Sequence, residues 1–318
     1  MSDSNKICWI ITSGDIGTEN QCLGVAEALG MHPVVKRIKL RFPWEQMMPW
    51  LRFAEQYALS PASDPIDPPW PDILICCGRK SIGIALYVKK MSGGKTFLVQ
   101  IQHPNISPRH FDLVAVPRHD QMKSAENVIT TTGATHRVTP EKIALAKQMF
   151  EPVLGTLPAP RVAVLIGGAS GAYRMTADTA KRLAEQLLAL KTPLMITVSR
   201  RTGAENTRLL RHMLKKADIY FWDGEGDNPY FALLGFANHI LVTEDSVSMV
   251  SEAISTGKPV QIIPLEGGTK RFNLFHQALQ NQGYTRPFTG SLELWSYIPP
   301  NDTLNVAAAI RRKMKLEG

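Results

Sequence analysis

The sequence lacks any apolar run long enough to cross a lipid bilayer. Its longest apolar stretches have the length of a β-strand, whereas a membrane-spanning helix needs about 20 residues. The first residues enter a strand-like run, KICWIIT, without the basic, apolar and small-residue order of a signal peptide. We therefore expect a cytoplasmic protein, and peripheral attachment to the inner face of a membrane stays open.

Cysteine is scarce, and its spacing matches no common metal-ligand pattern. The 318 residues include four cysteines, Cys8, Cys22, Cys76 and Cys77. The last two are adjacent and point to opposite faces of a strand, which is typical of buried free thiols in a reducing compartment. The sequence therefore predicts no metal site, and no cofactor is expected.

A nucleic-acid motif with interleaved aromatic and basic residues is also lacking, so we expect no nucleic-acid partner. The formal net charge of +8 favours anionic partners such as nucleotides or acidic lipids, unless the cations are spread as ordinary solvated surface. With 44% hydrophobic and 20% charged residues, the composition is that of a soluble globular protein. A length of 318 residues suits two α/β domains.

The stretch from His239 to Pro264 contains the most informative pattern. HILVT and PVQII predict two strands, and the residues between them predict a helix from about Ser246 to Ser255 that stops at Gly257. The N-terminus of such a helix attracts anions, because its first N–H groups lack helical partners and the helix dipole is positive there.

Polar residues crowd this helix start, and a carboxylate follows one turn later. Asp245, Ser246 and Ser248 surround the first turn, and Glu252 shares one helix face with Ser248. A nucleoside diphosphate fits this arrangement, with phosphate on the N-terminal amides and ribose hydroxyls on the Glu252 carboxylate. The alternative is a capped crossover helix with a purely structural role.

Four strand-end turns of the second half are expected at one edge of a sheet. Strand–helix alternation predicts a parallel, doubly wound sheet, which gathers the carboxyl ends of its strands. In this prediction Arg200 or Arg201 pairs with a phosphate, and the turn at 223–230 contacts a base. The predicted nucleotide-sugar-binding residues are Gly167, Gly168, Ser170, Ser199, Arg200, Arg201, Asp223, Asn228, Asp245, Ser246, Val247, Ser248 and Glu252. An α/β domain with ordinary polar loops is the competing interpretation.

The first half supplies three candidates for a general base. Asp15 and Glu19 follow the first predicted strand, at the end where open α/β sheets bind ligands. His103 follows a later strand, and its imidazole titrates near neutral pH. A turn-capping role is the alternative for His103.

Residues 36–53 combine cations with large apolar side chains. Lys36, Arg37, Lys39 and Arg41 precede the apolar residues, which are Trp44, Met47, Met48, Trp50, Leu51 and Phe53. Basic residues beside Trp and Leu are typical of an interfacial membrane-binding surface, which would make an anionic membrane a partner. An edge strand followed by a core helix is the alternative.

Three prolines and a glycine in EPVLGTLPAP indicate a domain boundary. The fold class we predict is α/β, with two doubly wound Rossmann-like domains that face each other across a cleft. The first spans residues 1–152 and the second residues 161–300. A C-terminal helix, 301–318, follows and can return to the first domain.

The run from Glu244 to Pro259 resembles the donor-binding element of GT-B glycosyltransferases and of UDP-sugar 2-epimerases. The pairs DS and EA and the triplet GKP stand at the family spacing, and Glu244 with Glu252 forms the E-x7-E pair of many retaining GT-B enzymes. This resemblance implies that Glu244 touches the sugar and makes it a candidate catalytic residue. The chain departs from the epimerases at Val247 and Ser248, where their turn has two glycines.

The whole chain resembles the mitochondrial fission factor family first described in plants, which has many bacterial members. The runs that carry the resemblance are SGDIGTENQCLGVAEALG, PDILICCGRKS, TFLVQIQHP, FDLVAVPRHD, NVITTTGATHRVT, RVAVLIGGASGAYRMT, TVSRRT, DGEGDNPYFALLG, VTEDSVSMVSEAISTGKPV and RPF. They cover almost the full length. The resemblance implies a GT-B-like fold that binds nucleotide sugars. Plant members are associated with recruiting a dynamin-related protein to the mitochondrial surface.

Two functions follow from these expectations. The first is a metal-independent glycosyltransferase, with the nucleotide-sugar donor in the second domain and an unknown acceptor, a lipid-linked one being a candidate, under the first. Backbone amides at 246–248 and the Arg200–Arg201 pair would stabilise the departing diphosphate in place of a metal. The second is a non-enzymatic membrane-surface adaptor that recruits a protein partner. The polar turns favour the enzyme, and the absence of an unambiguous base keeps the adaptor open.

Overall fold

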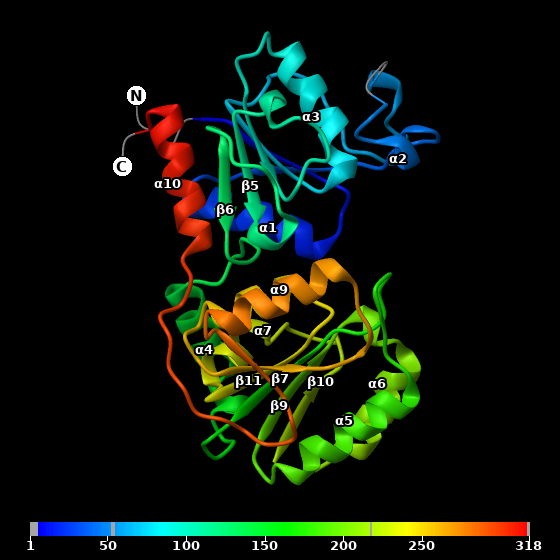
Figure 1. The fold of residues 1–318 in the computed structure, drawn as a ribbon, viewed down its shortest axis with the longest axis vertical. Helices are drawn as coiled ribbons and strands as arrows, with labels where there is room; N and C mark the ends of the chain where they lie inside the picture. Colours follow the sequence, from blue (N-terminus) through cyan, green and yellow to red (C-terminus); the bar gives the residue numbers. More distant parts are fainter. Residues whose placement is uncertain (1–5, 52–54, 217, 317–318) are drawn as a thin grey trace. The chain divides into compact units, whose positions relative to one another are not determined.

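Two units, each built around one parallel sheet, make up the chain (Figure 1). The computed structural model describes residues 6–51, 55–216 and 218–316. Unit 1 contains residues 1–137 and 301–318, and unit 2 contains residues 138–300. The α/β class with two Rossmann-like units is therefore confirmed.

Unit 1 alternates buried strands with helices around a six-stranded sheet of order β2-β1-β3-β4-β5-β6. Its strands are β1 (Cys8–Thr12), β2 (Val34–Arg37), β3 (Ile73–Cys77), β4 (Phe97–Ile101), β5 (Leu113–Pro117) and β6 (Val128–Thr131). Its helices are α1 (Ile16–Ala28), α2 (Trp44–Met47), α3 (Arg79–Met91) and α10 (Asp302–Met314), with short 3-10 helices at Glu55–Tyr57, Pro108–His110 and Arg118–Asp120. Every neighbouring pair is parallel, and continuous apolar strands are expected where helices cover both faces.

Alternate side chains of these strands serve two separate cores. Ile10 packs in the cluster that α1 and α10 complete, whereas Ile11 packs in the cluster under α3. The C-terminal helix α10 contributes Val306 and Ile310 to the first of these. Its first residue, Asp302, is buried and accepts hydrogen bonds from the amides of Thr132 at 3.0 Å and Gly133 at 2.9 Å. These contacts place α10 in unit 1.

Unit 2 repeats the plan with a sheet of order β10-β9-β7-β11-β12-β14 and an antiparallel pair β13-β8. Its strands are β7 (Val162–Ile166), β8 (Tyr173–Arg174), β9 (Leu194–Val198), β10 (Ile219–Trp222), β11 (His239–Thr243), β12 (Val260–Ile263), β13 (Glu266–Gly267) and β14 (Thr285–Pro287). Its helices are α4 (Pro140–Leu154), α5 (Ala177–Ala189), α6 (Ala204–Met213), α7 (Tyr230–Phe236), α8 (Val247–Ile254) and α9 (Lys270–Asn281), with a 3-10 turn at Arg200–Thr202. The strand–helix–strand pattern predicted around residues 239–264 is present as β11, α8 and β12.

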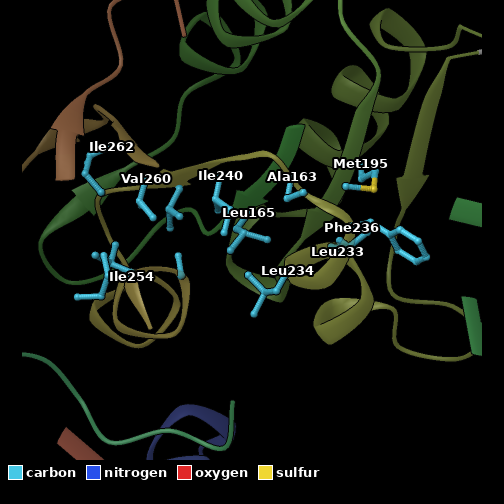
Figure 2. Packing of buried hydrophobic residues seen from close by; sticks show 14 of the residues in the cluster. Ala163, Leu165, Met195, Leu233, Leu234, Phe236, Ile240, Ile254, Val260 and Ile262 are labelled. Carbon is cyan, nitrogen blue, oxygen red and sulfur yellow. The ribbon is translucent and has the colours of Figure 1, made fainter. Parts of the chain in front are cut away.

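The sheet of unit 2 also has a core on each face. Figure 2 shows one of them, where Leu165 and Ile240 of the sheet pack with Leu233 of α7 and Ile254 of α8. On the other face, side chains of the same strands pack with α5 and α6. Helices cover both faces of this sheet. A ligand can therefore reach the sheet where its strands end, and a site is expected there.

The boundary between the units differs from the expected one. The sequence placed residues 138–152 in the first domain because the prolines come after them. In the structure these residues form α4, whose Leu154 lies in the same core as Leu233 of α7. Packing therefore assigns α4 to unit 2, and the chain changes units just before it, at residue 138.

Residues 36–53 were interpreted either as a membrane-binding surface or as an edge strand followed by a core helix. The structure has features of both. β2 is an edge strand, and Met48 is fully buried beside Gly83 of α3. Phe42 and Trp50 are exposed, by 79% and 65% of their surface, and Trp44 is half-buried. Phe53 lies outside the described residues. Among the described helices, none has the length and apolarity that a membrane span needs.

Candidate functional site

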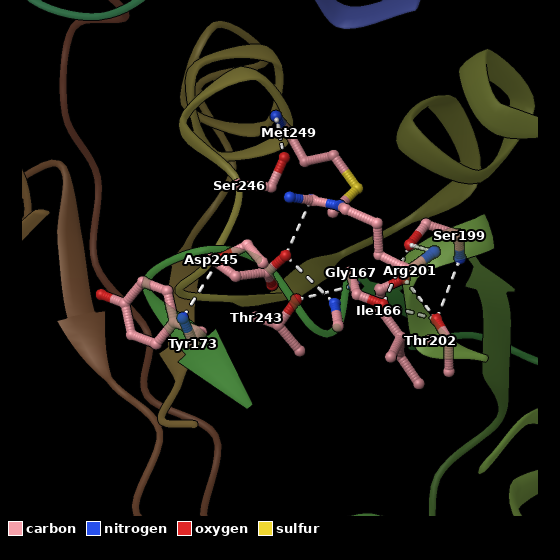
Figure 3. Close-up of polar contacts among 12 residues, drawn as sticks. Ile166, Gly167, Tyr173, Ser199, Arg201, Thr202, Thr243, Asp245, Ser246 and Met249 are labelled. Carbon is pink, nitrogen blue, oxygen red and sulfur yellow. Dashed lines mark hydrogen bonds and ion pairs between the residues drawn. The ribbon is translucent and has the colours of Figure 1, made fainter. Parts of the chain in front are cut away.

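Four turns meet at one edge of the unit 2 sheet. They follow β7, β9, β10 and β11, which are mutually parallel, so their carboxyl ends point the same way. The central three turns, after β7, β9 and β11, are joined by hydrogen bonds and an ion pair. Figure 3 shows residues of these three turns around the side chain of Asp245.

Asp245 is the hub of this edge. Its side chain has no exposed surface, and its Oδ2 lies 2.7 Å from Nη2 of Arg201 and accepts from the amide of Gly168 at 3.0 Å. Burial raises the pKa of Asp245, while hydrogen bonds and the Arg201 guanidinium counter that rise. The sequence predicted Asp245 as a nucleotide-sugar-binding residue, and in the structure its side chain points inward and holds Arg201 at the helix start.

The two glycines after β7 make this close approach possible. A Cβ on Gly167 would lie 2.3 Å from the carboxylate oxygens of Asp245, and a Cβ on Gly168 would lie 2.2 Å from the carbonyl oxygen of Arg201. The Ser199 hydroxyl donates to the Gly167 carbonyl at 2.9 Å, and the Ala169 amide donates to the Arg201 carbonyl at 2.9 Å. Side chains larger than glycine would separate the turns.

Ser246 begins α8 as its N-cap. Its hydroxyl accepts from the Met249 amide at 3.3 Å, which satisfies one of the first-turn donors. Val247 and Ser248 are half-buried in that turn. The backbone N–H groups in the first turn of a helix have no partner within the helix itself. The start of α8 therefore still attracts an anion. Arg201, which is ion-paired with Asp245, places a guanidinium beside it.

Glu252 lies one turn further along α8 and is almost fully buried. Its Oε2 accepts from the hydroxyl of Tyr230 at 2.6 Å. Burial raises the pKa of this carboxyl to about 7, and the hydrogen bond from Tyr230 opposes the rise. Tyr230 belongs to the turn predicted to contact a base, but its hydrogen bond with Glu252 was not predicted, because nothing in a single sequence pairs position 230 with position 252.

Glu244 is tied to the neighbouring turn. Its Oε1 accepts from the Leu265 amide at 2.6 Å, and its carbonyl oxygen bonds Nε2 of His276 at 2.8 Å. Burial raises the pKa of Glu244 above its ordinary value, and Asp245 adds to the effect. The structure thus connects this predicted sugar contact with the segment that follows β12.

Three of the remaining predicted residues of unit 2 contact residues near them in the sequence, and a fourth, Arg200, is exposed. Ser170 accepts from the amides of Ala172 and Tyr173, and Asn228 accepts from the Tyr230 amide at 3.0 Å at the start of α7. Asp223 pairs with Arg211 of α6. Arg200 is exposed in the 3-10 turn after β9. The turn after β10 is therefore not linked by these contacts to the Asp245 cluster.

The three base candidates of unit 1 differ in availability. Glu19 forms a two-contact ion pair with Arg37, with N–O distances of 3.0 and 2.7 Å. Nδ1 of His103 accepts from the Asn105 amide at 3.0 Å, so the proton of the neutral ring resides on Nε2. Asp15 is exposed at the start of α1 and accepts from the Ser13 hydroxyl at 3.0 Å.

The residue before His103, Gln102, has a strained backbone conformation. Gln102 has a φ of 73°, in the left-handed region that side chains other than glycine seldom adopt. Its Nε2 donates to Oε1 of Gln21 at 3.2 Å. The sequence singled out His103 as a candidate base, but it contains no signal for the strained backbone beside it. Within the described ranges, no group of three or more His, Cys, Asp or Glu residues could hold a metal ion.

Comparison with known proteins now adds a family. The sequence profile described as mitochondrial fission ELM1 matches residues 16–314. The chain belongs to the mitochondrial fission ELM1 family. It is 35% identical over 277 residues to the mitochondrial fission protein ELM1 of Arabidopsis thaliana, covering 78% of this chain but 65% of that protein. It is 27% identical to the uncharacterized protein RP120 of Rickettsia prowazekii, covering 97% and 98% of the two chains.

Solved structures show that this family member has the GT-B fold. The UDP-GlcNAc 2-epimerase of Methanocaldococcus jannaschii, solved with UDP-GlcNAc and UDP, has a TM-score of 0.56 at 11% identity and covers 97% of this chain and 99% of its own. The UDP-GlcNAc 2-epimerase of Neisseria meningitidis has a TM-score of 0.54 at 13% identity, with 98% and 99% covered. MurG of Acinetobacter baumannii has a TM-score of 0.50 at 13% identity, with 98% and 92% covered.

The packing of Gly167 against Asp245 leads to a stability prediction. Gly167→Ala forces a methyl group into the buried carboxylate, so we expect the free energy of unfolding to fall by about 1–3 kcal/mol, the usual effect of overpacking. Gly171→Ala is the matched control, because a Cβ there meets nothing within 4 Å and the expected change is within about 0.5 kcal/mol. Urea unfolding measures both. Equal stability of the two variants would contradict the tight contact.

Proposed function

We propose that unit 2 binds a nucleoside diphosphate sugar at the strand-end edge around Asp245. The observation that carries the proposal is the ion pair between Arg201 and the buried Asp245, which fixes a guanidinium beside the N-terminus of an eight-residue helix. Only one Nη of Arg201 contacts Asp245, and 41% of the side chain is exposed. The rest of its donor fork is therefore available to phosphate oxygens, for which guanidinium geometry is well suited.

The ribose contact in this proposal is the Glu252 carboxylate, one turn from the phosphate end. Ser248 and Glu252 lie one turn apart on the same face of α8. A nucleotide that lies along the helix would therefore reach both positions. Support also comes from the relatives of known structure, since two UDP-GlcNAc 2-epimerases with this fold were solved with UDP-GlcNAc. Val247 and Ser248, where the epimerase turn has glycines, leave less room for the pyrophosphate and place more of its binding on the arginines.

The reaction proposed for this site is transfer of the sugar to an acceptor without a metal ion. Amides at the start of α8 and the guanidinium of Arg201 would offset the charge that develops on the departing diphosphate. Of the three base candidates in unit 1, Glu19 is held in an ion pair by Arg37, whereas Asp15 is exposed and accepts a hydrogen bond from the Ser13 hydroxyl. The acceptor stays unidentified, and a lipid-linked one is a candidate.

The first test separates phosphate binding from base binding. Arg200→Ala and Arg201→Ala should weaken UDP binding by roughly tenfold or more each, the scale of a lost charge-assisted contact of about 1.5–3 kcal/mol, and leave uridine binding nearly unchanged. Calorimetry with UDP and uridine measures this. Arg208→Ala on the exposed side of α6 is the matched control. Equal losses for UDP and uridine would show that the arginines are structural, and no UDP binding by the wild type would contradict the proposal.

Attachment to an anionic membrane surface is a second proposed function, compatible with an enzyme or an adaptor. The observation behind it is a group of exposed apolar side chains at Phe42, Met47, Trp50 and Tyr57. Arg79 donates to the carbonyls of Gln46 and Met48, at 3.0 and 3.2 Å, and so holds the segment in place.

Cations flank this apolar group, which suits an anionic surface. Lys39 and Arg41 are exposed on the segment itself, and each cation near such a surface contributes about 1 kcal/mol. Lys80 is paired with Glu45 at 2.8 Å and is partly neutralised. Because the two free cations sit beside the apolar side chains, binding should combine insertion with a salt-sensitive attraction.

Vesicle sedimentation tests this second function. The wild type should pellet with phosphatidylcholine vesicles that contain phosphatidylserine, less so at high salt, and the Phe42→Ser, Trp50→Ser double variant should stay in solution. Leu294→Ser with Ile298→Ser removes two exposed apolar side chains of unit 2 and serves as the control. No pelleting of the wild type, or equal loss in the control, would contradict membrane attachment through this segment.

A further inference from the structure

Tyr230 reaches the Glu252 carboxylate from a different helix. The hydroxyl donates to Oε2 at 2.6 Å, and Glu252 is only 8% exposed. Tyr230 opens α7 directly after the turn at 223–229, and its amide donates to Oδ1 of Asn228 at 3.0 Å. Its ring packs against the core and edge-on to Phe231. The backbone and ring thus fix the hydroxyl from α7, while the carboxylate comes from α8.

We propose that Tyr230 is a positioning residue, whose hydroxyl keeps the Glu252 carboxylate oriented and ionised so that it can accept the hydroxyls of a nucleotide ribose. This inference rests on the nucleotide site proposed above. A carboxylate has about four lone-pair positions, and Tyr230 uses one of them. Oε1 and the second lone pair of Oε2 are enough for two ribose hydroxyls, so Tyr230 and the ribose need not compete.

The surroundings of Glu252 explain why it needs such a donor. Burial raises the pKa of Glu252 to about 7, and the Tyr230 hydrogen bond is the influence that lowers it. The two influences on the pKa of Glu252 are therefore its burial and the hydrogen bond from Tyr230. Lys258, the cation that follows α8, donates instead to the carbonyls of Leu234 and Gly235. The Tyr230 hydroxyl therefore favours the ionised state of Glu252 near neutral pH.

The sign of the pH effect follows from the donor role of ribose. Ribose hydroxyls donate most strongly to the charged carboxylate, so UDP affinity should fall as the pH drops through the pKa of Glu252. Tyr230→Phe removes the hydroxyl that opposes the effect of burial, so the pKa of Glu252 should rise further. The loss of affinity in the variant should begin at a higher pH than in the wild type, and the two proteins should differ least in alkaline solution.

The experiment is a pH series of UDP affinity by calorimetry on the full chain. Tyr230→Phe should bind UDP roughly tenfold more weakly than the wild type near pH 6.5 and within about twofold of it near pH 9, because Glu252 of the variant becomes ionised only at a higher pH. Tyr297→Phe is the matched control, because Tyr297 also donates at 2.6 Å, but to the backbone carbonyl of Lys258. UDP without the 2′- and 3′-hydroxyls should not distinguish Tyr230→Phe from the wild type.

The outcomes separate this role from the proposed nucleotide site. If UDP binds but Tyr230→Phe follows the wild-type pH profile, or Tyr297→Phe shows the same shift, the positioning role is wrong and the site stands. If the wild type does not bind UDP, both are wrong. Should Tyr230→Phe fail to fold, Glu252→Gln keeps an acceptor for Tyr230 and should lose the pH dependence attributed to Glu252. A wild-type profile in Glu252→Gln would overturn the inference.

Discussion

The ion pair between Arg201 and Asp245 determines the geometry of the strand-end edge in unit 2. The carboxylate is completely buried, and an unpaired charge there would be strongly destabilising. Its contacts with Arg201 and the Gly168 amide join the turns after β9, β7 and β11. The pair thus holds a cation beside the start of α8, and the two glycines after β7 provide the space for it.

The sequence predicted the parts of this site that depend on local pattern. Strand-length apolar runs, the Ser246 cap and the Gly257 stop define β11, α8 and β12 without tertiary information, and the structure contains all three elements. The GT-B fold could be predicted from the resemblance of the whole chain and from the alternation of strands and helices. The inward direction of Asp245 could not be predicted, because an acidic residue before a helix can cap it, face solvent or form a buried pair.

Other features depended on packing that a sequence does not display. The prolines of residues 152–160 indicated a boundary, but α4 packs on α7 and belongs to unit 2. Residues 36–53 were expected as either a core helix or a membrane surface, and the structure buries Met48 while it exposes Trp50. The hydrogen bond between Tyr230 and Glu252 joins positions 22 residues apart, and no periodic pattern connects them. In each case the missing information is which neighbour a side chain meets.

Amide hydrogen exchange with and without UDP tests the nucleotide site most directly. Bound phosphate should slow exchange at residues 246–249, the start of α8, and in the turn at 199–201, since both would contact it. The edge strand β14 of the same sheet should show no change. If UDP leaves exchange at 246–249 unaltered, or protects other parts of the chain instead, the proposed position of the diphosphate is wrong.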